Sequence, residues 1–394
     1  MPKDSVVIVS AARTPLGAFM GDFSELAAHD LGGVAIRAAV ERAGVAPQKV
    51  DEVLFGNCLM AGQGQAPARQ ALFKGGLPQS TGAVTLSKMC GAGMEAAILA
   101  HDQLVAGSRE IMVAGGMESM TNAPYLLKKA RTGYRMGQGS IYDHMMLDGL
   151  EDAYEPGRSM GTFGEDCAAR YGFTREQQDA FAIASVERAQ AAAAAGLFQA
   201  EIAPVTVRTR AGQVTIGVDE GPAKARLDRI ASLKPAFRKD GTITAASSSS
   251  INDGAAALVL MRESTARALG CQPLARIVAH ATHAQAPEWF TTAPVEAATK
   301  VLGKAGWTAD QVDLWEINEA FAVVPRALMH ELNVPHDKVN VHGGACALGH
   351  PIGASGARII VTLLHALKAR GGSKGLATLC IGGGEATAMA LEMA

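Results

Sequence analysis

Short apolar runs alternate with longer amphipathic segments along the whole chain. Residues 6–10, 111–114, 276–279 and 376–379 are mostly Val, Ile, Leu and Ala, which is typical of strands buried on both faces. The segments between such runs have helical periodicity. The pattern therefore predicts an α/β fold in which helices cover mixed, mostly parallel sheets. We expect residues 6–10 and 276–279 to open two sheets.

The second half of the chain repeats the first. Gly44 recurs as Gly306 at an offset of 262 residues, each shortly before a Val-Asp pair, and Gly93 recurs as Gly356 at an offset of 263. The offset reaches 265 at a later Gly-Ser pair. Because it drifts so slowly, we predict two copies of one unit. The unit comprises a helix, a strand led by Val-Asp, a glycine turn into a second helix, and a buried strand ending in glycines.

One long segment has no counterpart in the repeat. We predict that residues 119–250 form an inserted loop domain, that residues 1–118 plus 251–272 form the first half, and that residues 273–394 form the second. Within the insertion, the capping box Thr-Arg-Glu-Gln at residues 174–177 predicts a helix that ends at Gly196. The alternating residues 205–216 predict a hairpin.

Composition limits the classes of function. The chain has 394 residues, of which 48% are hydrophobic, so it can bury substantial cores. The chain has 36 Lys and Arg residues and 38 Asp and Glu residues. It therefore has no overall positive charge that would attract nucleic acid or an anionic membrane. No secretory or transit pattern opens the sequence, and no apolar run reaches about 18 residues. We therefore expect a cytoplasmic protein whose six cysteines are free thiols.

Cys90 is the first candidate for chemistry. It precedes Gly-Ala-Gly at the start of a predicted helix, where the sulfur is uncrowded and the helix N-terminus is expected to lower the pKa of the thiol. A nucleophilic role competes with the ordinary role of a buried small hydrophobe.

His350 lies between Gly349 and Pro351 in the turn that corresponds to the turn of Cys90. A neutral imidazole there could take a proton from a thiol, although a loop histidine bonded to backbone is the plainer alternative. His342, Cys346 and His350 have a metal-like spacing of four residues. The intervening glycines oppose the helix that would align them, so we predict no metal site.

Two further residues complete the candidate site. In the alignment of the halves, Cys380 takes the place of the Gly-Gly pair at residues 115–116, and the three glycines that follow it offer N–H groups for an oxyanion. Burial as a strand residue is the alternative. Asn318 could cap the next helix or hold a water molecule at a carbonyl oxygen.

Basic residues gather in two places. Residues 222–239 hold six Lys and Arg side chains, which are a solvated face or a local site for the phosphates of an anionic carrier. Residues 125–136 interleave basic and apolar side chains, and we favour a subunit contact for them.

Along its whole length the sequence resembles the thiolase family. The motifs that carry the resemblance are Ser-Ala-Ala-Arg-Thr-Pro at residues 10–15, Cys-Gly-Ala-Gly at 90–93, Gly-Gly-Met-Glu-Ser-Met at 115–120, Asn-Asp-Gly-Ala-Ala at 252–256, Asn-Glu-Ala-Phe at 318–321, Gly-His-Pro-Ile-Gly-Ala-Ser-Gly at 349–356 and Cys-Ile-Gly-Gly-Gly at 380–384. The resemblance implies the thiolase fold, with a loop domain inserted in the first half, and assembly as dimers or as dimers of dimers, of which we expect the homotetramer. It also implies coenzyme A and acyl-CoA as substrates and no tightly bound cofactor.

The resemblance implies a role for each candidate. Cys90 would accept an acyl group from acyl-CoA after His350 activates it, and Cys380 would deprotonate a second acetyl-CoA, giving acetoacetyl-CoA and CoA. The N–H groups of Cys90 and Gly382 would form one oxyanion hole. His350 with a water on Asn318 would form the other.

The implied contacts with CoA follow the family pattern less closely. Ser249 matches a serine near the pantetheine, and Met160 and Phe321 fall in the acyl pocket. Ser159 replaces a common histidine, and residues 288–294 replace a common Met-Gly segment. Pro222 and Arg229 stand where CoA contacts are often found, so we expect Lys224 or Arg226 to bind the phosphates.

These residues favour a condensing enzyme that joins two acetyl-CoA molecules. The nearest alternative is a broader 3-ketoacyl-CoA thiolase of fatty-acid degradation. A ketoacyl synthase typically pairs its cysteine with two histidines. Cys380, at the position of the second histidine, argues against that class of enzyme. A catalytically inactive acyl-CoA-binding protein is the alternative outside the enzymes.

Overall fold

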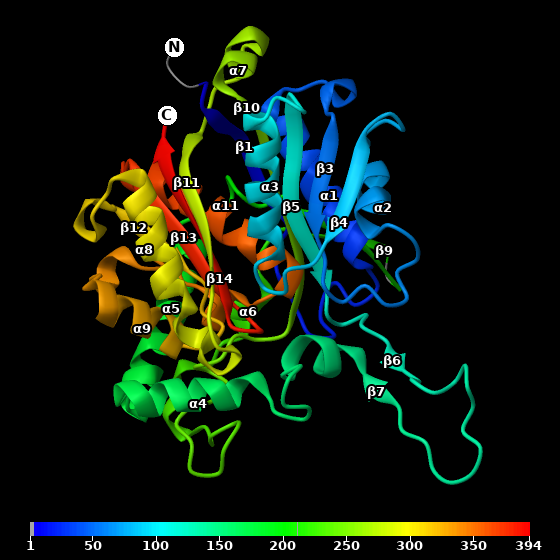
Figure 1. Cartoon of the computed structure of the whole chain (residues 1–394), viewed down its shortest axis with the longest axis vertical. Helices are drawn as coiled ribbons and strands as arrows, with labels where there is room; N and C mark the ends of the chain where they lie inside the picture. The colour runs from blue at the N-terminus through cyan, green and yellow to red at the C-terminus, as the bar shows by residue number, and fades with distance from the viewer. Residues whose placement is uncertain (1–3, 211) are drawn as a thin grey trace.

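The computed structural model describes residues 4–210 and 212–394. Its main feature is a sheet of ten strands in the order β12-β13-β14-β11-β1-β10-β5-β3-β4, with β2 beside β10 (Figure 1). The strands of the first half are β1 Val6–Arg13, β2 Gly17–Ala18, β3 Glu52–Gly56, β4 Gly82–Leu86, β5 Ile111–Ser119 and β10 Asn252–Arg262. Those of the second half are β11 Ala275–Ala284, β12 Leu314–Ile317, β13 Lys374–Ile381 and β14 Glu385–Met393.

The strand directions confirm a mixed, mostly parallel arrangement. In the first half β3 is parallel to β4 and β5, while β10 is antiparallel to its neighbours β5 and β1. In the second half β12 is parallel to β13, while β14 is antiparallel to β13 and β11. Among the described strands, therefore, β10 and β14 are those that run against the rest of their halves.

The expectation of two separate sheets is wrong. β1 pairs with β11 through Val7 with Arg276 and Ile8 with Ala275, so the two half-sheets form one continuous sheet. Each of these strands would otherwise leave a row of backbone groups without partners at its outer edge, and the short pairing covers part of both edges.

Two helices lie between the half-sheets and form the centre of the fold. α3 (Ala92–Val105) packs against β3 and β5, and α11 (Ile352–Arg370) packs against β5 and β10 of the first half and β12 and β13 of the second. α1 (Ala28–Ala43) and α2 (Pro67–Lys74) cover the outer face of the first half, and α8 (Ala293–Ala305) covers that of the second (Figure 1). Among the described residues α11 alone is long and apolar enough to cross a membrane, but it is 83% buried as this core helix.

α3 and α11 approach each other closely at glycines that correspond in the two halves. A Cβ atom on Gly93 would lie 2.8 Å from the backbone nitrogen of Ala357, and one on Gly356 would lie 2.4 Å from that of Met94. Both distances are shorter than real Cβ contacts. The recurring glycine therefore sets the contact between the two halves.

Equivalent hydrogen bonds confirm the duplication. Asp51 accepts from the N–H groups of Glu110 and Ile111 at 2.7 and 3.0 Å, and Asp313 accepts from those of Ser373 and Lys374, both at 2.8 Å. Each aspartate thus ties the start of one strand to the start of the next parallel strand.

The strand register corrects one detail of the sequence alignment. Glu52 pairs with Met112 and Leu314 pairs with Gly375, so the residue of the first half that corresponds to Cys380 is Met117. The predicted counterpart, Gly-Gly at residues 115–116, lies one and two residues too early. The loop between helix and strand is shorter in the second half, which returns the offset to 263.

The segment between β5 and β10 has its own elements. They are β6 Tyr125–Leu126, β7 Tyr142–Asp143, a π-helical turn Met146–Leu150, α4 Met160–Tyr171, α5 Arg175–Ala194, β8 Val205–Thr209, β9 Gly212–Ile216, α6 Glu220–Lys224 and a 3₁₀ turn Leu227–Ser232. The capping box at Thr174 and the β8–β9 hairpin are confirmed, although residue 211 lies outside the described residues. The boundaries 119 and 250 stay a prediction.

Further helices and 3₁₀ turns complete the described elements. They are α7 Glu263–Leu269, α9 Val323–Leu332, α10 Ala345–Leu348 and the 3₁₀ turns Pro47–Lys49, Pro287–Thr292, Ala309–Gln311 and His336–Lys338.

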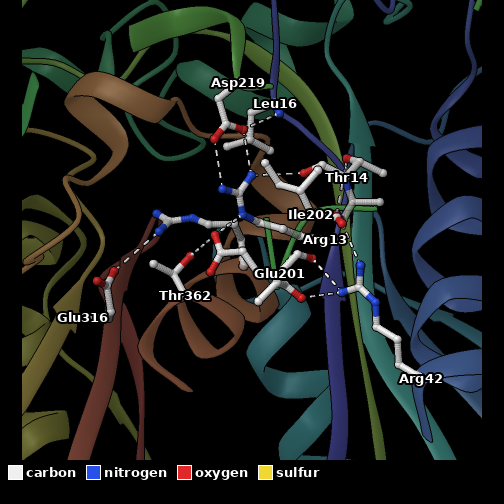
Figure 2. A network of polar contacts seen from close by, with 12 residues as sticks. Arg13, Thr14, Leu16, Arg42, Glu201, Ile202, Asp219, Glu316 and Thr362 are labelled. Carbon is white, nitrogen blue, oxygen red and sulfur yellow. Dashed lines mark hydrogen bonds and ion pairs between the residues drawn. The ribbon is translucent and has the colours of Figure 1, made fainter. Parts of the chain in front are cut away.

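A buried ionic network ties β1 to the inserted segment (Figure 2). The Arg13 side chain is fully buried and bonds Glu201 at 2.5 Å and Asp219 at 2.7 Å. Thr362 of α11 also donates to Glu201, at 3.3 Å. Because an isolated buried charge is costly, the two acids stabilise the buried guanidinium and fix where the insertion meets the core.

Candidate active site

Four of the predicted chemical residues converge on one cavity of about 320 Å³, whereas Asn318 is not among the residues that line it. Its walls include Cys90 from the first half, His350, Cys380 and Gly382 from the second, and Leu150 from the insertion. Residues distant in sequence are thus brought together at one crevice, as expected for open α/β sheets.

Cys90 lies in a tight turn two residues before α3 begins. Met89, just before it, has φ 45°, a left-handed conformation that is rare for non-glycine residues. A Cβ on Gly91 would lie 2.3 Å from Ile381, so the glycine lets this turn lie against the end of β13. The turn therefore holds the thiol beside the glycines that follow Cys380.

Burial dominates the acidity of the Cys90 thiol. It raises the pKa of Cys90 to about 11, although the N–H groups of Gly382 and Cys90 itself hydrogen-bond the sulfur and oppose that rise. The expectation of a lowered pKa is therefore wrong, because desolvation of the charged form outweighs the backbone donors. At neutral pH the residue is a thiol and needs a base to become a nucleophile.

His350 lines the same cavity as Cys90. Its Nδ1 lies 2.5 Å from Ser355 Oγ, and Ser355 donates its own proton to the carbonyl of Pro351 at 2.9 Å. Nδ1 must then carry the hydrogen, which leaves the lone pair on Nε2. Nε2 is buried without a partner. Burial, with a smaller effect from Arg358, lowers the pKa of His350 to about 3, so the imidazole is neutral as expected.

Cys380 is nearly inaccessible, with 1% of its surface exposed. Burial raises its pKa well above the usual range for a thiol, and a negative charge on Cys90 raises it further. The two thiols are therefore close enough to oppose simultaneous ionisation. This opposition is compatible with a mechanism in which Cys90 and Cys380 are ionised in separate steps.

Asn318 follows β12 and is fully buried. Neither its Nδ2 nor its Oδ1 has a protein partner. The next helix, α9, begins only at Val323, so the capping alternative is excluded. A buried amide without partners is costly, which favours the alternative in which it binds a water molecule or a substrate oxygen.

Glu118 is a positioning residue that the sequence interpretation did not single out. From the end of β5 it accepts from the backbone N–H groups of Cys58 at 3.0 Å, Leu59 at 3.1 Å and Gly353 at 2.9 Å. It thereby joins the first half to the start of α11. Its position in a glycine-rich motif at the end of a strand was the available signal, whereas its partners could not be read from the sequence.

The two residues predicted in the acyl pocket and the serine predicted near the pantetheine also line the cavity. Met160, Phe321 and Ser249 are all in its wall. Phe290, from the segment where the sequence departs from the family pattern, and Leu147, from the π-helical turn, were not predicted as pocket residues. Their apolar side chains extend the wall beyond the two thiols.

The two predicted phosphate contacts lie elsewhere. Lys224 is paired with Glu220, and Arg226 binds Asp228 through two hydrogen bonds at 3.0 and 3.1 Å. Neither side chain lines the cavity. Their role toward the phosphates of CoA stays a prediction.

Comparisons with known proteins agree with this geometry. Residues 6–264 match the model of the thiolase N-terminal domain, and residues 271–393 match that of the thiolase C-terminal domain. The chain is 51% identical to an acetyl-CoA acetyltransferase of Escherichia coli, covering 98% of each chain, and 50% identical to one of Cupriavidus necator, covering 98% of this chain and 99% of the relative. The crystal structure of the Bacillus anthracis acetyl-CoA acetyltransferase matches the fold with a TM-score of 0.97 at 41% identity, over 100% of this chain and 99% of that one. Cavity, fold and sequence together show that this chain belongs to the thiolase family.

Proposed function

We propose that this protein is an acetyl-CoA C-acetyltransferase, which joins two molecules of acetyl-CoA into acetoacetyl-CoA and CoA and catalyses the reverse thiolysis. The observation that carries the proposal is the meeting of Cys90, His350 and Cys380 in one cavity, with the N–H of Gly382 directed at the first thiol. The relatives named acetyl-CoA acetyltransferase support the choice of substrate.

The first half-reaction transfers an acetyl group to the enzyme. Nε2 of His350 takes the proton of the Cys90 thiol, and the thiolate attacks the thioester carbonyl of acetyl-CoA. The oxyanion accepts hydrogen bonds from the N–H groups of Cys90 and Gly382. The tetrahedral intermediate then expels the CoA thiolate, which takes the proton of Cys380, so that acetyl-Cys90, a Cys380 thiolate and a protonated His350 remain.

The second half-reaction forms the carbon–carbon bond. Cys380, as thiolate, removes a proton from the methyl group of a second acetyl-CoA. The enolate oxygen is stabilised by His350 and by a water bound to Asn318. The enolate carbon attacks acetyl-Cys90, the bond to sulfur breaks, and acetoacetyl-CoA leaves as the Cys90 thiolate recovers its proton from His350. Thiolysis follows the same steps in reverse.

Mass spectrometry of the intact protein tests the first half-reaction. Mixing the protein with acetyl-CoA should add one acetyl group, and Cys90→Ala should add none. A protein that binds acetyl-CoA but shows neither adduct nor turnover would be a binding protein, and the proposal would be wrong.

A broader 3-ketoacyl-CoA thiolase is the second candidate. Phe290 and Leu147 place apolar side chains in the cavity wall, and apolar side chains can contact a longer acyl chain. Thiolysis rates of acetoacetyl-CoA and of a longer 3-ketoacyl-CoA decide between them. A strong preference for the longer substrate would replace the main proposal with this one.

Assembly as a homotetramer is part of the proposal. The arm at residues 125–143, which carries β6 and β7, projects from the body of the molecule (Figure 1). It exposes Tyr125, Leu127, Met136 and Ile141 by 50% or more of their surface. A second copy of the chain would cover these apolar side chains. Light scattering of the parent protein and of a variant with Met136→Asp and Ile141→Asp tests this, and an unchanged mass for the variant would contradict the contact.

A further inference from the structure

Three side chains from both halves of the fold meet outside the active-site cavity. His101 and Asp102 are consecutive residues on α3, and His280 lies on β11. Asp102 Oδ1 is 3.0 Å from His101 Nδ1 and 3.0 Å from His280 Nε2, and the two histidine nitrogens are 3.1 Å apart. None of the three lines the active-site cavity. Two imidazole nitrogens and a carboxylate oxygen thus form a nearly equilateral triangle.

The size of this triangle fits one metal ion. Donors bonded to a metal at about 2.1 Å are about 3.0 Å apart on one face of an octahedron and about 3.4 Å apart in a tetrahedron. The observed edges of 3.0 to 3.1 Å match the octahedral face. The two rings are nearly perpendicular, at 78°, so their planes do not obstruct each other around a common ion.

The surroundings give the triangle both rigidity and access. Each histidine side chain is 17% exposed, whereas the side chain of Asp102 is 57% exposed. The rings are therefore held by packing, and the carboxylate leaves an entry from solvent. Lys304, which donates to the carbonyl of His280 at 2.9 Å, is the charge that opposes a cation. Glu95, whose charge interacts with that of Asp102, adds a negative charge to these surroundings.

We propose that His101, Asp102 and His280 bind a divalent first-row transition metal ion, with solvent in the remaining coordination positions. Imidazole and carboxylate donors suit Co²⁺, Ni²⁺ and Zn²⁺ and disfavour the hard ions Mg²⁺ and Ca²⁺. The ion bridges α3 of the first half and β11 of the second. It therefore stabilises the contact between the halves without entering the reaction.

Titration of the metal-free protein with Co²⁺ alone tests the proposal, after iodoacetamide has blocked the accessible thiols. The expected result is one bound Co²⁺ per chain, with d–d absorption of nitrogen and oxygen ligands and no thiolate-to-cobalt band. Zn²⁺ should displace it and raise the melting temperature, because an ion that binds only the folded state stabilises that state.

Three variants identify the ligands. His280→Gln and Asp102→Asn, which keep side-chain size, should weaken binding by more than about 100-fold, since loss of a mere outer-shell partner already costs about 10- to 100-fold. His283→Gln, three residues further along β11, is the matched control and should bind as the parent does. Melting temperatures measured without metal show whether each variant folds.

The remaining outcomes overturn the proposal. They are no binding of Co²⁺ up to millimolar concentration, binding unchanged in both His280→Gln and Asp102→Asn, or a thiolate band showing that cysteines hold the ion. None of these results depends on enzymatic turnover, so the test is independent of the proposed function.

Discussion

The backbone N–H of Gly382 donates a hydrogen bond to the thiol of Cys90, across the boundary between the two halves of the fold. The donor belongs to the turn after β13, and the sulfur belongs to the turn before α3. One half therefore supplies the nucleophile and the other supplies part of its oxyanion hole.

Gly382→Pro removes this donor, whereas Gly382→Ala keeps it. We expect the proline variant to lose about 10²- to 10³-fold in the rate of Cys90 acetylation, the usual cost of one oxyanion-hole donor. The alanine variant should lose much less, because its Cβ would lie 3.3 Å from Met160 Cε, the flexible end of a side chain. Quenched-flow acetylation measured by intact mass gives both rates. Equal rates in two variants that melt like the parent would show that the N–H plays no part.

Cys380→Ser separates the two half-reactions. The serine hydroxyl is a far weaker acid and base, so condensation and thiolysis should fall by about 10²- to 10⁴-fold. Acetylation of Cys90 should remain, because nucleophile and imidazole are intact. Steady-state rates and intact mass measure the two steps. Cys271→Ser, a half-buried thiol outside the cavity, is the control and should retain both. Failure of Cys380→Ser to acetylate would contradict this division of roles.

Gly356→Ala should destabilise the contact between α3 and α11. Its Cβ would lie 2.4 Å from a backbone nitrogen, which cannot move aside as a side chain can, so we expect a loss of about 1–3 kcal/mol in the free energy of unfolding. Gly303→Ala, in α8 with nothing within 4 Å of the added Cβ, is the control and should stabilise by about 0.5–1 kcal/mol. Urea unfolding of both variants measures the two changes, and a neutral Gly356→Ala would refute the close packing.

Glu316 makes stability depend on pH. Burial raises the pKa of Glu316 from 4.5 to about 8, against the opposing effect of Arg358. Between these two values the folded state holds a proton that the unfolded state has lost, so this residue makes the protein less stable as the pH rises through that window.

Glu316→Gln should remove this loss of stability with rising pH, because the amide resembles the protonated acid. We expect the melting temperature of the variant relative to the parent to rise from pH 5 to pH 8, by an amount equivalent to a few kcal/mol. Calorimetry at both pH values measures it, with the exposed Glu110→Gln as the control. A difference between variant and parent that does not change with pH would show that Glu316 is ionised throughout this range.

Much of the site could be predicted from local patterns in the sequence. Cys90, His350 and Cys380 stand beside glycines at the ends of predicted strands or the starts of predicted helices, and the repeat placed the first two in equivalent turns. Glu118 and Ser355 were missed as positioning residues, because their importance lies in partners that the fold brings to them.

The sequence by itself determined the α/β class, the duplication, and Cys90, His350 and Cys380 as the candidates for chemistry, since periodicity, glycine positions and caps are local information. Only the tertiary structure decided how strongly each group is desolvated and which distant groups meet. It reversed the expected shift of the Cys90 pKa, fixed the tautomer of His350, joined two half-sheets into one and brought His280 to His101 and Asp102. Burial and long-range contact depend on how the two halves pack together, and no window of neighbouring residues contains that information.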